Sequence, residues 1–135
     1  TRAVYTSGRA DGFGVFTDFT GNRVENVPAI TSRNGVVLER GRHALQLLVS
    51  HVGESWADAF NRREMSPLGV VGLVPAYTVT DVNAAFAVSR HARVRVGVNN
   101  LLDRAYFTVR PQGFPGPGVW PSDGRGMQAS LELTY

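Results

Sequence analysis

The chain has 135 residues, about the length of one ordinary domain. Its hydrophobic content of 43% is too high for a disordered chain, and its 15 Gly and 7 Pro predict many turns and few long helices. The absence of Cys excludes a disulfide scaffold, Cys-ligated zinc and thiol catalysis, and the mild net charge of +3, carried by scattered Arg residues, argues against a nucleic-acid-binding surface.

Neither a transmembrane helix nor a leader is visible in the sequence. No run of residues approaches the roughly 18 apolar residues that a transmembrane helix needs. The first residues, TRAVYTSGRADG, lack the apolar stretch of a signal peptide. Because the chain begins without Met, in the middle of an alternating segment, we expect it to be a piece of a longer protein.

Alternating side chains predict about six long strands. Successive side chains of a strand point to opposite faces, so each segment has one apolar and one polar face. The third segment also fits an amphipathic helix, but Val49, Val52 and Gly53 and its strand-like neighbours favour a strand. In chain order the predicted strands are Ala3–Ser7, Ala29–Arg40, His43–Trp56, Tyr77–Ser89, Arg93–Phe107 and Gly126–Tyr135.

The connections between these segments alternate in length. The turns at 40–42 and 90–92 are very short, whereas the loops 8–28, 57–75 and 108–124 are long. An up-and-down order places the short turns at one rim and the long loops at the other. Outer-membrane β-barrels have short periplasmic turns and long extracellular loops. The pattern therefore favours such a barrel over a soluble sheet.

The apolar faces carry no charge. A charged side chain facing lipid at the middle of a bilayer costs about 2–4 kcal/mol, so the lipid face of a barrel strand is expected to lack charges. Charged residues such as Arg33, Arg95 and Glu132 fall on the opposite faces. The apolar sets are Val36 and Leu38; Leu45, Leu47 and Val49; Val82, Ala84, Phe86 and Val88; Val94, Val96 and Val98; and Met127, Ala129, Leu131 and Leu133.

Two short motifs and the last strand resemble a known family. Gly97–Phe107 reads GVNNLLDRAYF and resembles the G-V-x-N-L-x-D-x-x-Y box near the C-terminus of TonB-dependent outer-membrane receptors. Gly21–Pro28 reads GNRVENVP and resembles their G-N-x-V-P-x-x-P stretch, with Glu25 in place of the first Pro. The closing strand also matches, although Tyr135 stands where that family commonly ends in Phe. The order and spacing of these marks look closest to ferric-citrate-type receptors.

The resemblance implies an all-β fold and an uptake function. Residues 1–135 would be the C-terminal part of a transmembrane barrel of about 22 strands, without the plug domain. Alone, they would form an open antiparallel up-and-down meander with bare edges at Ala3–Ser7 and Gly126–Tyr135. The implied function is uptake of ferric siderophore-type chelates across the bacterial outer membrane. The implied partners are the lipid bilayer, the chelate, the barrel-assembly machinery and TonB, the last through the missing plug region.

The family box is expected to be structural, because Asn and Asp tolerate turn-like backbone and cap strands or bulges. Its matching residues are Gly97, Asn99, Asn100, Leu101, Asp103 and Tyr106. As the family's terminal aromatic residue, Tyr135 would be recognised by the barrel-assembly machinery. The alternative is that Tyr135 is an ordinary aromatic residue at the membrane interface.

Ligand contacts are expected in the long loops. Ferric citrate and most ferric siderophores are anionic, so Arg62, Arg63 and Arg110 are candidate donors of charge-assisted hydrogen bonds. Phe114 and Trp120 are candidates to stack on an aromatic chelator. The histidines and carboxylates form no recognisable metal or catalytic motif, so we expect no enzyme activity, no bound metal and no cofactor.

Two other kinds of protein fit the same pattern of strands and loops. One is a small soluble β-barrel that holds an apolar ligand. The other is a small outer-membrane barrel of eight strands, with a hairpin at Phe13–Phe19. The sequence does not distinguish a siderophore, cobalamin or a sugar as the cargo.

Overall fold

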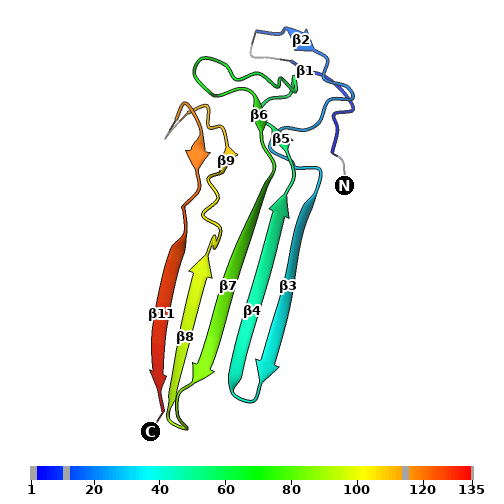
Figure 1. Ribbon diagram of the computed structural model, residues 1–135. Coiled ribbons are helices and arrows are strands. Elements are labelled where there is room, and N and C mark those ends of the chain that lie inside the picture. The colour runs from blue at the N-terminus through cyan, green and yellow to red at the C-terminus, as the bar shows by residue number, and fades with distance from the viewer. Residues whose placement is uncertain (1–2, 11–12, 114–115, 135) are drawn as a thin grey trace. The chain divides into compact units, whose positions relative to one another are not determined.

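The computed structural model describes residues 3–10, 13–113 and 116–134. Within these ranges the chain is all-β (Figure 1). No described segment is a helix long and apolar enough to cross a membrane. The strands are β1 (Arg9–Ala10), β2 (Phe16–Thr17), β3 (Thr31–Arg40), β4 (His43–Val52), β5 (Ser55–Trp56), β6 (Leu73–Val74), β7 (Tyr77–Ala87), β8 (Ala92–Asn99), β9 (Phe107–Val109), β10 (Trp120–Pro121) and β11 (Gly126–Leu133).

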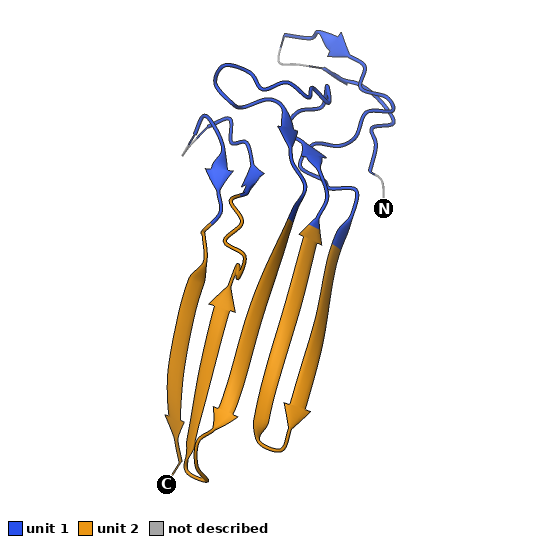
Figure 2. Cartoon of the chain, viewed as in Figure 1, with its two compact units in different colours: residues 1–31, 52–77, 106–122 blue, residues 32–51, 78–105, 123–135 orange. Residues whose placement is uncertain are grey.

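The chain divides into two compact units, which Figure 2 colours separately. Unit 1 comprises residues 1–31, 52–77 and 106–122. Unit 2 comprises residues 32–51, 78–105 and 123–135. Unit 2 therefore holds most of the five long strands, and unit 1 holds most of the three predicted long loops.

Unit 2 is built on one antiparallel meander. Its strand order is β11-β8-β7-β4-β3, so neighbours in the sheet follow each other along the chain (Figure 1). Among the described residues the sheet ends at β11 on one side and at β3 on the other, so it is open. The predicted open antiparallel meander is confirmed.

The predicted first strand is wrong. The segment Ala3–Ser7 adds no strand to the long sheet, and only Val4 pairs, in an isolated bridge with Arg23. The second edge of the sheet is therefore β3. The segment is too short to supply a full row of hydrogen bonds, and Gly8 follows it directly.

Two predicted strands are each divided into two in the structure. The strand reading of 43–56 is confirmed, but β4 ends at Val52, and a separate short strand, β5, pairs with β6. The segment 93–107 divides into β8 and β9. Between them Asn100 and Asp103 have φ values of 49° and 50°, in the left-handed region that a continuous strand does not use.

The two tight turns close one end of the long sheet. Gly41, with a φ of 60°, makes the β3–β4 turn, where a side chain would be strained. The Arg42 guanidinium donates to the carbonyls of Ser89 (3.2 Å) and Arg90 (3.3 Å) in the β7–β8 turn. Arg93 donates in return to the Arg42 carbonyl at 3.3 Å. These bonds tie the two turns together.

Strand register places the apolar sets on one face. Directly paired residues of neighbouring strands share a face. The rows that cross β11, β8 and β7 are Met127–Val98–Val82, Ala129–Val96–Ala84 and Leu131–Val94–Phe86. The intervening rows are Gln128–Gly97–Asn83, Ser130–Arg95–Ala85 and Glu132–Arg93–Ala87. The predicted separation into one apolar and one polar face is therefore present in the sheet.

Unit 1 has a small core of its own. Phe19, Ala57 and Val74 are buried. The Phe19 ring packs edge-on against Phe60, with centroids 4.9 Å apart, and against Tyr5 at 5.7 Å. Three two-stranded sheets, β1–β2, β5–β6 and β9–β10, order the loops around this core.

Candidate ligand site and membrane face

The apolar face of unit 2 is exposed. Met127 and Leu131 are 75% and 62% accessible, and Leu38 is 62% accessible. A soluble monomer rarely leaves so continuous an apolar surface uncovered. Because the paired apolar rows hold no charged residue, this face suits the hydrocarbon of a bilayer.

The opposite face is polar and hollowed. A cavity of about 480 Å³ lies on it, lined by side chains that include Gln46, Asn83, Arg95 and Gln128. Gly97 lines this cavity and has no room for a side chain, because an added Cβ would lie 2.8 Å from Asn83 Oδ1 and 2.8 Å from Gln128 Nε2. Glycine thus lets two amide side chains converge above the strand.

An ion pair crosses the same polar face. Arg95 on β8 donates to Glu132 on β11 at 2.8 Å. Both side chains are more than half exposed, so water weakens the interaction and the pair adds little stability.

Asn100 organises the end of β8. It is 4% exposed, and its backbone N–H donates to Asp81 Oδ1 at 2.9 Å. Its side chain contacts both backbone groups of Arg104: Oδ1 accepts the N–H at 2.9 Å, and Nδ2 donates to the carbonyl at 3.0 Å. A positive φ and a short amide side chain are both needed here, and Asn supplies both.

Asp103 continues the same turn. Its N–H donates to the Asn100 carbonyl at 2.8 Å, and its Oδ1 accepts the Arg125 N–H at 2.9 Å just before β11. The neighbouring Leu101 N–H donates to the Thr80 carbonyl on β7 at 2.7 Å. The family-box residues Asn100, Leu101 and Asp103 thus join segments next to β7, β8 and β11.

The structure also shows where the other residues of the family box lie. Asn99 ends β8 and is exposed, and Gly97 has the role described above. Tyr106, in unit 1, stacks on Tyr77 with ring centroids 4.2 Å apart. Tyr135 lies outside the described residues.

Unit 1 contains the candidate ligand cavity. It measures about 480 Å³ and brings together the predicted ligand residues Arg62 and Arg110. Two carboxylate residues, Asp58 and Glu25, and the Phe60 ring also line it. A cavity with two guanidinium groups and an aromatic wall suits an anionic chelate, and its two carboxylates moderate the positive charge.

Arg62 and Asp58 form an ion pair. Arg62 Nε donates to Asp58 Oδ2 at 2.9 Å, and its backbone N–H donates to Oδ1 at 3.3 Å. The Arg62 guanidinium also lies over the Phe60 ring, 5.1 Å from its centroid. Its side chain is 56% exposed, so a soluble ligand can reach it.

Arg110 holds the loops together. Its Nε and Nη2 donate to the Leu73 carbonyl at 3.2 and 3.1 Å, and Nη1 donates to the Gly69 carbonyl at 3.0 Å. Its guanidinium also lies 4.8 Å from the Phe107 ring centroid. Desolvation on partial burial lowers the pKa of Arg110. Three of its nitrogens are therefore committed to backbone carbonyls of the 57–75 loop.

The remaining predicted ligand residues do not join this cavity. Arg63 lies 3.7 Å from Glu54 and stacks over Trp56. Trp120 pairs with Val109 across β9–β10 and is exposed. Phe114 lies outside the described residues. Among the predicted ligand residues that the structure describes, only Arg62 and Arg110 line this cavity.

Sequence reasoning missed two asparagines whose hydrogen bonds hold the segments beside the cavity, although neither lines it. Asn61, with a φ of 56°, accepts the Arg23 N–H at 2.7 Å and donates to the Arg23 carbonyl at 2.9 Å. Asn22 Nδ2 donates to the Ala59 carbonyl at 2.9 Å. The available signal was only that Asn and Asp favour turns. Their partners are more than 30 residues away in sequence, and spacing does not reveal them.

The histidines lie apart on unit 2. His51 contacts Thr78 Oγ1 at 2.9 Å, His91 contacts the Thr134 carbonyl oxygen at 3.2 Å, and His43 packs near Phe86. Within the described ranges, no group of three His, Asp or Glu residues is arranged to hold a metal ion.

Comparison with known sequences gives one partial relative. No protein-family model matches the chain. The metal-pseudopaline receptor CntO of Pseudomonas aeruginosa is 36% identical over 62 residues, which are 46% of this chain and 8% of that protein. The chain therefore spans less than a tenth of the length of the curated relative that it matches.

Solved structures match over more of the chain. The unliganded ferric citrate transporter FecA has a TM-score of 0.74 at 23% identity, over 85% of this chain and 18% of its own. The siderophore receptor PiuA of Acinetobacter baumannii has a TM-score of 0.70 at 19% identity, over 95% and 17%. The ferric yersiniabactin uptake receptor FyuA of Yersinia pestis has a TM-score of 0.65 at 21% identity, over 87% and 18%.

This chain has the fold of part of a TonB-dependent receptor barrel. At these identities the likeness concerns the fold. The three solved neighbours are described as a ferric citrate transporter, a siderophore receptor and a ferric yersiniabactin uptake receptor. The chain covers less than a fifth of each of the three, as a segment of such a barrel does. The predicted fold class is therefore confirmed.

Proposed function

We propose that residues 1–135 belong to the C-terminal part of the barrel of a TonB-dependent outer-membrane receptor that imports ferric siderophore-type chelates. The observation that carries this proposal is the exposed apolar face of an open sheet whose fold matches receptor barrels. The apolar rows that cross β11, β8 and β7 on this face hold no charged residue. The names of the matched proteins, which take up ferric citrate, a siderophore or a metal chelate, support the cargo class.

The open sheet argues against a self-contained barrel. A closed eight-stranded barrel would use the hairpin near Phe13–Phe19 as part of its wall. Instead β1 and β2 form a separate two-stranded sheet in unit 1, and the long sheet ends at β3 and β11 among the described residues. These edges suit pairing with further strands of a larger barrel.

We infer that Arg62 contacts the chelate and that Arg110 supports the cavity. The Arg62 side chain is exposed, and its Nε donates to Asp58, so the rest of its guanidinium can reach a ligand. In contrast, all three guanidinium nitrogens of Arg110 donate to backbone carbonyls. The Phe60 ring under Arg62 offers a second surface to an aromatic chelator. Phe114 and Trp120 remain candidate stacking residues, and Arg63 remains a candidate of lower rank.

Membrane location is tested on the complete protein that carries this chain. We expect it in the outer-membrane fraction of a Gram-negative host, resistant to carbonate extraction. In a gel assay it should shift its mobility on boiling, as folded barrels do. Recovery as a soluble periplasmic or cytoplasmic protein would disprove the proposal.

Transport is tested by uptake of ⁵⁵Fe-labelled chelates. Cells that depend on this protein should accumulate ferric citrate or a ferric siderophore only when TonB is present. An equal rate in a strain without TonB would contradict the energy-coupled mechanism. If no ferric chelate is taken up but the protein sits in the outer membrane, the cargo class is wrong while the receptor architecture stands.

The binding site is tested by a matched pair of variants. Arg62→Gln should weaken binding of an anionic ferric chelate by about tenfold, because a charge-assisted hydrogen bond is lost. Arg90→Gln, in the β7–β8 turn, makes the same change in charge at an exposed residue that does not line the cavity. It should change affinity by less than about twofold. Equal effects of the two variants would show that general charge, and not the cavity, governs binding.

A further inference from the structure

A small groove opens on the apolar face of unit 2, beside the tight turns. It measures about 200 Å³. Its apolar walls are Leu38 of β3, Leu45 of β4 and Phe86 of β7, and its polar end is formed by Glu39, Arg40 and His43. The groove thus crosses three adjacent strands and has one apolar and one polar end.

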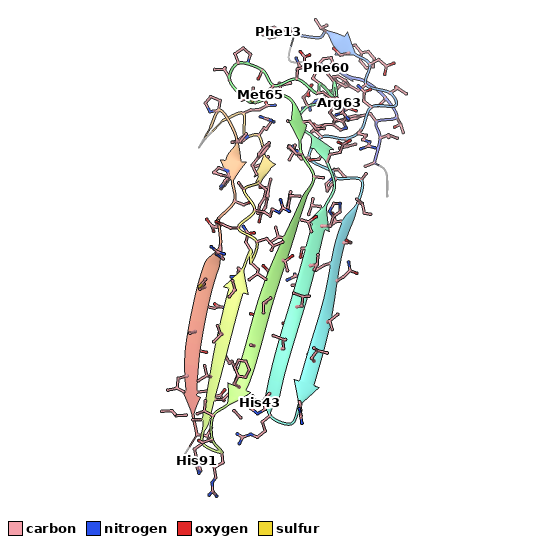
Figure 3. All side chains as sticks on the ribbon, viewed as in Figure 1. Phe13, His43, Phe60, Arg63, Met65 and His91 are labelled. Atoms are coloured by element: carbon pink, nitrogen blue, oxygen red, sulfur yellow. The ribbon has the colours of Figure 1, made fainter. Side chains whose placement is uncertain are left out.

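Strand geometry places both basic residues on the lipid side. Arg40 lies two residues after Leu38 on β3, and His43 lies two residues before Leu45 on β4, so each shares the face of its apolar neighbour. His43 is the first residue of β4 (Figure 3). Its ring centroid lies 6.2 Å from that of Phe86 on β7. Both side chains are exposed.

The charge around this groove is mostly positive. Arg42 and Arg93 bind the neighbouring turns through backbone carbonyls, and Arg90 lies in the β7–β8 turn. Glu39 alternates to the opposite face of β3, and Glu132 is paired with Arg95 on the polar face. Although Glu39 borders the groove, strand alternation directs its carboxylate away from the lipid side.

We propose that this groove docks an anionic phospholipid, with its acyl chain against Leu45 and Phe86 and its phosphate at Arg40 and His43. The proposal rests on the proposed function, which places the apolar face in a bilayer and the short turns at its periplasmic side. An Arg guanidinium and an imidazole N–H are matched donors for phosphate oxygens.

Charge complementarity selects an anionic lipid over a zwitterionic one. A headgroup such as that of phosphatidylethanolamine would bring its own ammonium group close to Arg40. Phosphatidylglycerol carries a net negative charge and no ammonium. Each basic residue near a bilayer surface favours anionic lipid by roughly fivefold in binding constant.

The test uses the complete protein in nanodiscs that contain phosphatidylethanolamine with or without phosphatidylglycerol. Native mass spectrometry then measures the lipid that stays bound after mild release from the disc. We expect retention of phosphatidylglycerol over phosphatidylethanolamine. Arg40→Gln should reduce this preference by about fivefold. His43→Gln, which removes the imidazole donor, should also reduce it. Arg33→Gln, on the same strand at a polar-face position, should leave it unchanged.

Three outcomes would overturn the proposal. One is equal retention of both lipids by the unaltered protein. Another is an equal effect of Arg33→Gln and Arg40→Gln, which would indicate general charge. The third is displacement of the bound lipid by inorganic phosphate alone, which would indicate a site for the headgroup without the apolar groove. A protein that fails to enter nanodiscs at all would instead refute the proposed membrane function, so the two failures are distinguishable.

Discussion

Asn100 forms a two-point hydrogen-bonded bridge to the backbone of Arg104, accepting its N–H at 2.9 Å and donating to its carbonyl at 3.0 Å. This bridge closes the turn that follows β8. Asn100 also takes a left-handed backbone conformation, with a φ of 49°. One buried side chain therefore fixes both the conformation and the partners of the segment between β8 and β9.

Replacing this side chain should destabilise the protein. We expect Asn100→Ala to lower the free energy of unfolding by about 1–3 kcal/mol, because two buried hydrogen bonds are lost and a left-handed conformation becomes strained. Thermal unfolding of the complete protein in detergent, followed by circular dichroism, measures the change. The exposed neighbour Asn99→Ala is the control and should change stability by less than about 0.5 kcal/mol. Equal stability of the two variants would contradict the structural role of Asn100.

Two adjacent positions on β11 should respond differently to a charge. Ala129 is in an apolar row and Gln128 is in a polar row. We expect Ala129→Arg to cost about 2–4 kcal/mol and to reduce the folded fraction in the outer membrane, because it places a charge in hydrocarbon. Gln128→Arg should assemble normally. The heat-dependent gel shift measures the folded fraction, and the opposite ranking would reverse the assignment of the two faces.

Arg110 should be sensitive even to Lys. Lys keeps the charge but lacks the planar group that reaches the Leu73 and Gly69 carbonyls together. We expect Arg110→Lys to raise the rate of chymotrypsin cleavage within loop 57–75 by about tenfold, because local opening becomes easier. The exposed Arg9→Lys is the control. Unchanged cleavage would show that the three hydrogen bonds do not hold the loop.

The contact between Tyr5 and Glu25 predicts a pH dependence at high pH. The Tyr5 hydroxyl donates to Glu25 Oε2, and this bond, with desolvation, raises the pKa of Tyr5 above its ordinary value of 10.0. A raised pKa favours the protonated form in the folded state. The resulting stability is fully present below pH 10 and is lost as the pH rises through the folded-state pKa. Tyr5→Phe should therefore be less stable than the unaltered protein at pH 8, with the difference shrinking above pH 10.

Urea unfolding at several pH values measures this difference. Tyr106→Phe is a suitable comparison, because it also removes a tyrosine hydroxyl but leaves the hydrogen bond from Tyr5 to Glu25 in place. The ring stack on Tyr77 remains possible in this variant. A Tyr5→Phe difference that stays constant from pH 8 to pH 11 would show that the hydroxyl contact contributes nothing.

The sequence alone determined the faces, the strand type and the alternation of short turns and long connections. These follow from local rules: side chains alternate along a strand, and Gly, Asn and Pro mark turns. The apolar sets that begin at Val94 and Met127 could be identified without knowing which strands pair. The observed register then joined these sets in shared rows.

Tertiary structure decided the ends of strands and the grouping of loop residues. The sequence at 93–107 alternates well enough for one strand, yet the hydrogen bonds of Asn100 to Arg104 and Asp81 break it into two. The partners of Arg110 lie 37 and 41 residues away, so only folding shows that it supports loop 57–75 while Arg62 remains exposed. Periodicity is a property of neighbours in sequence, whereas buried hydrogen bonds between distant segments depend on how the chain closes on itself.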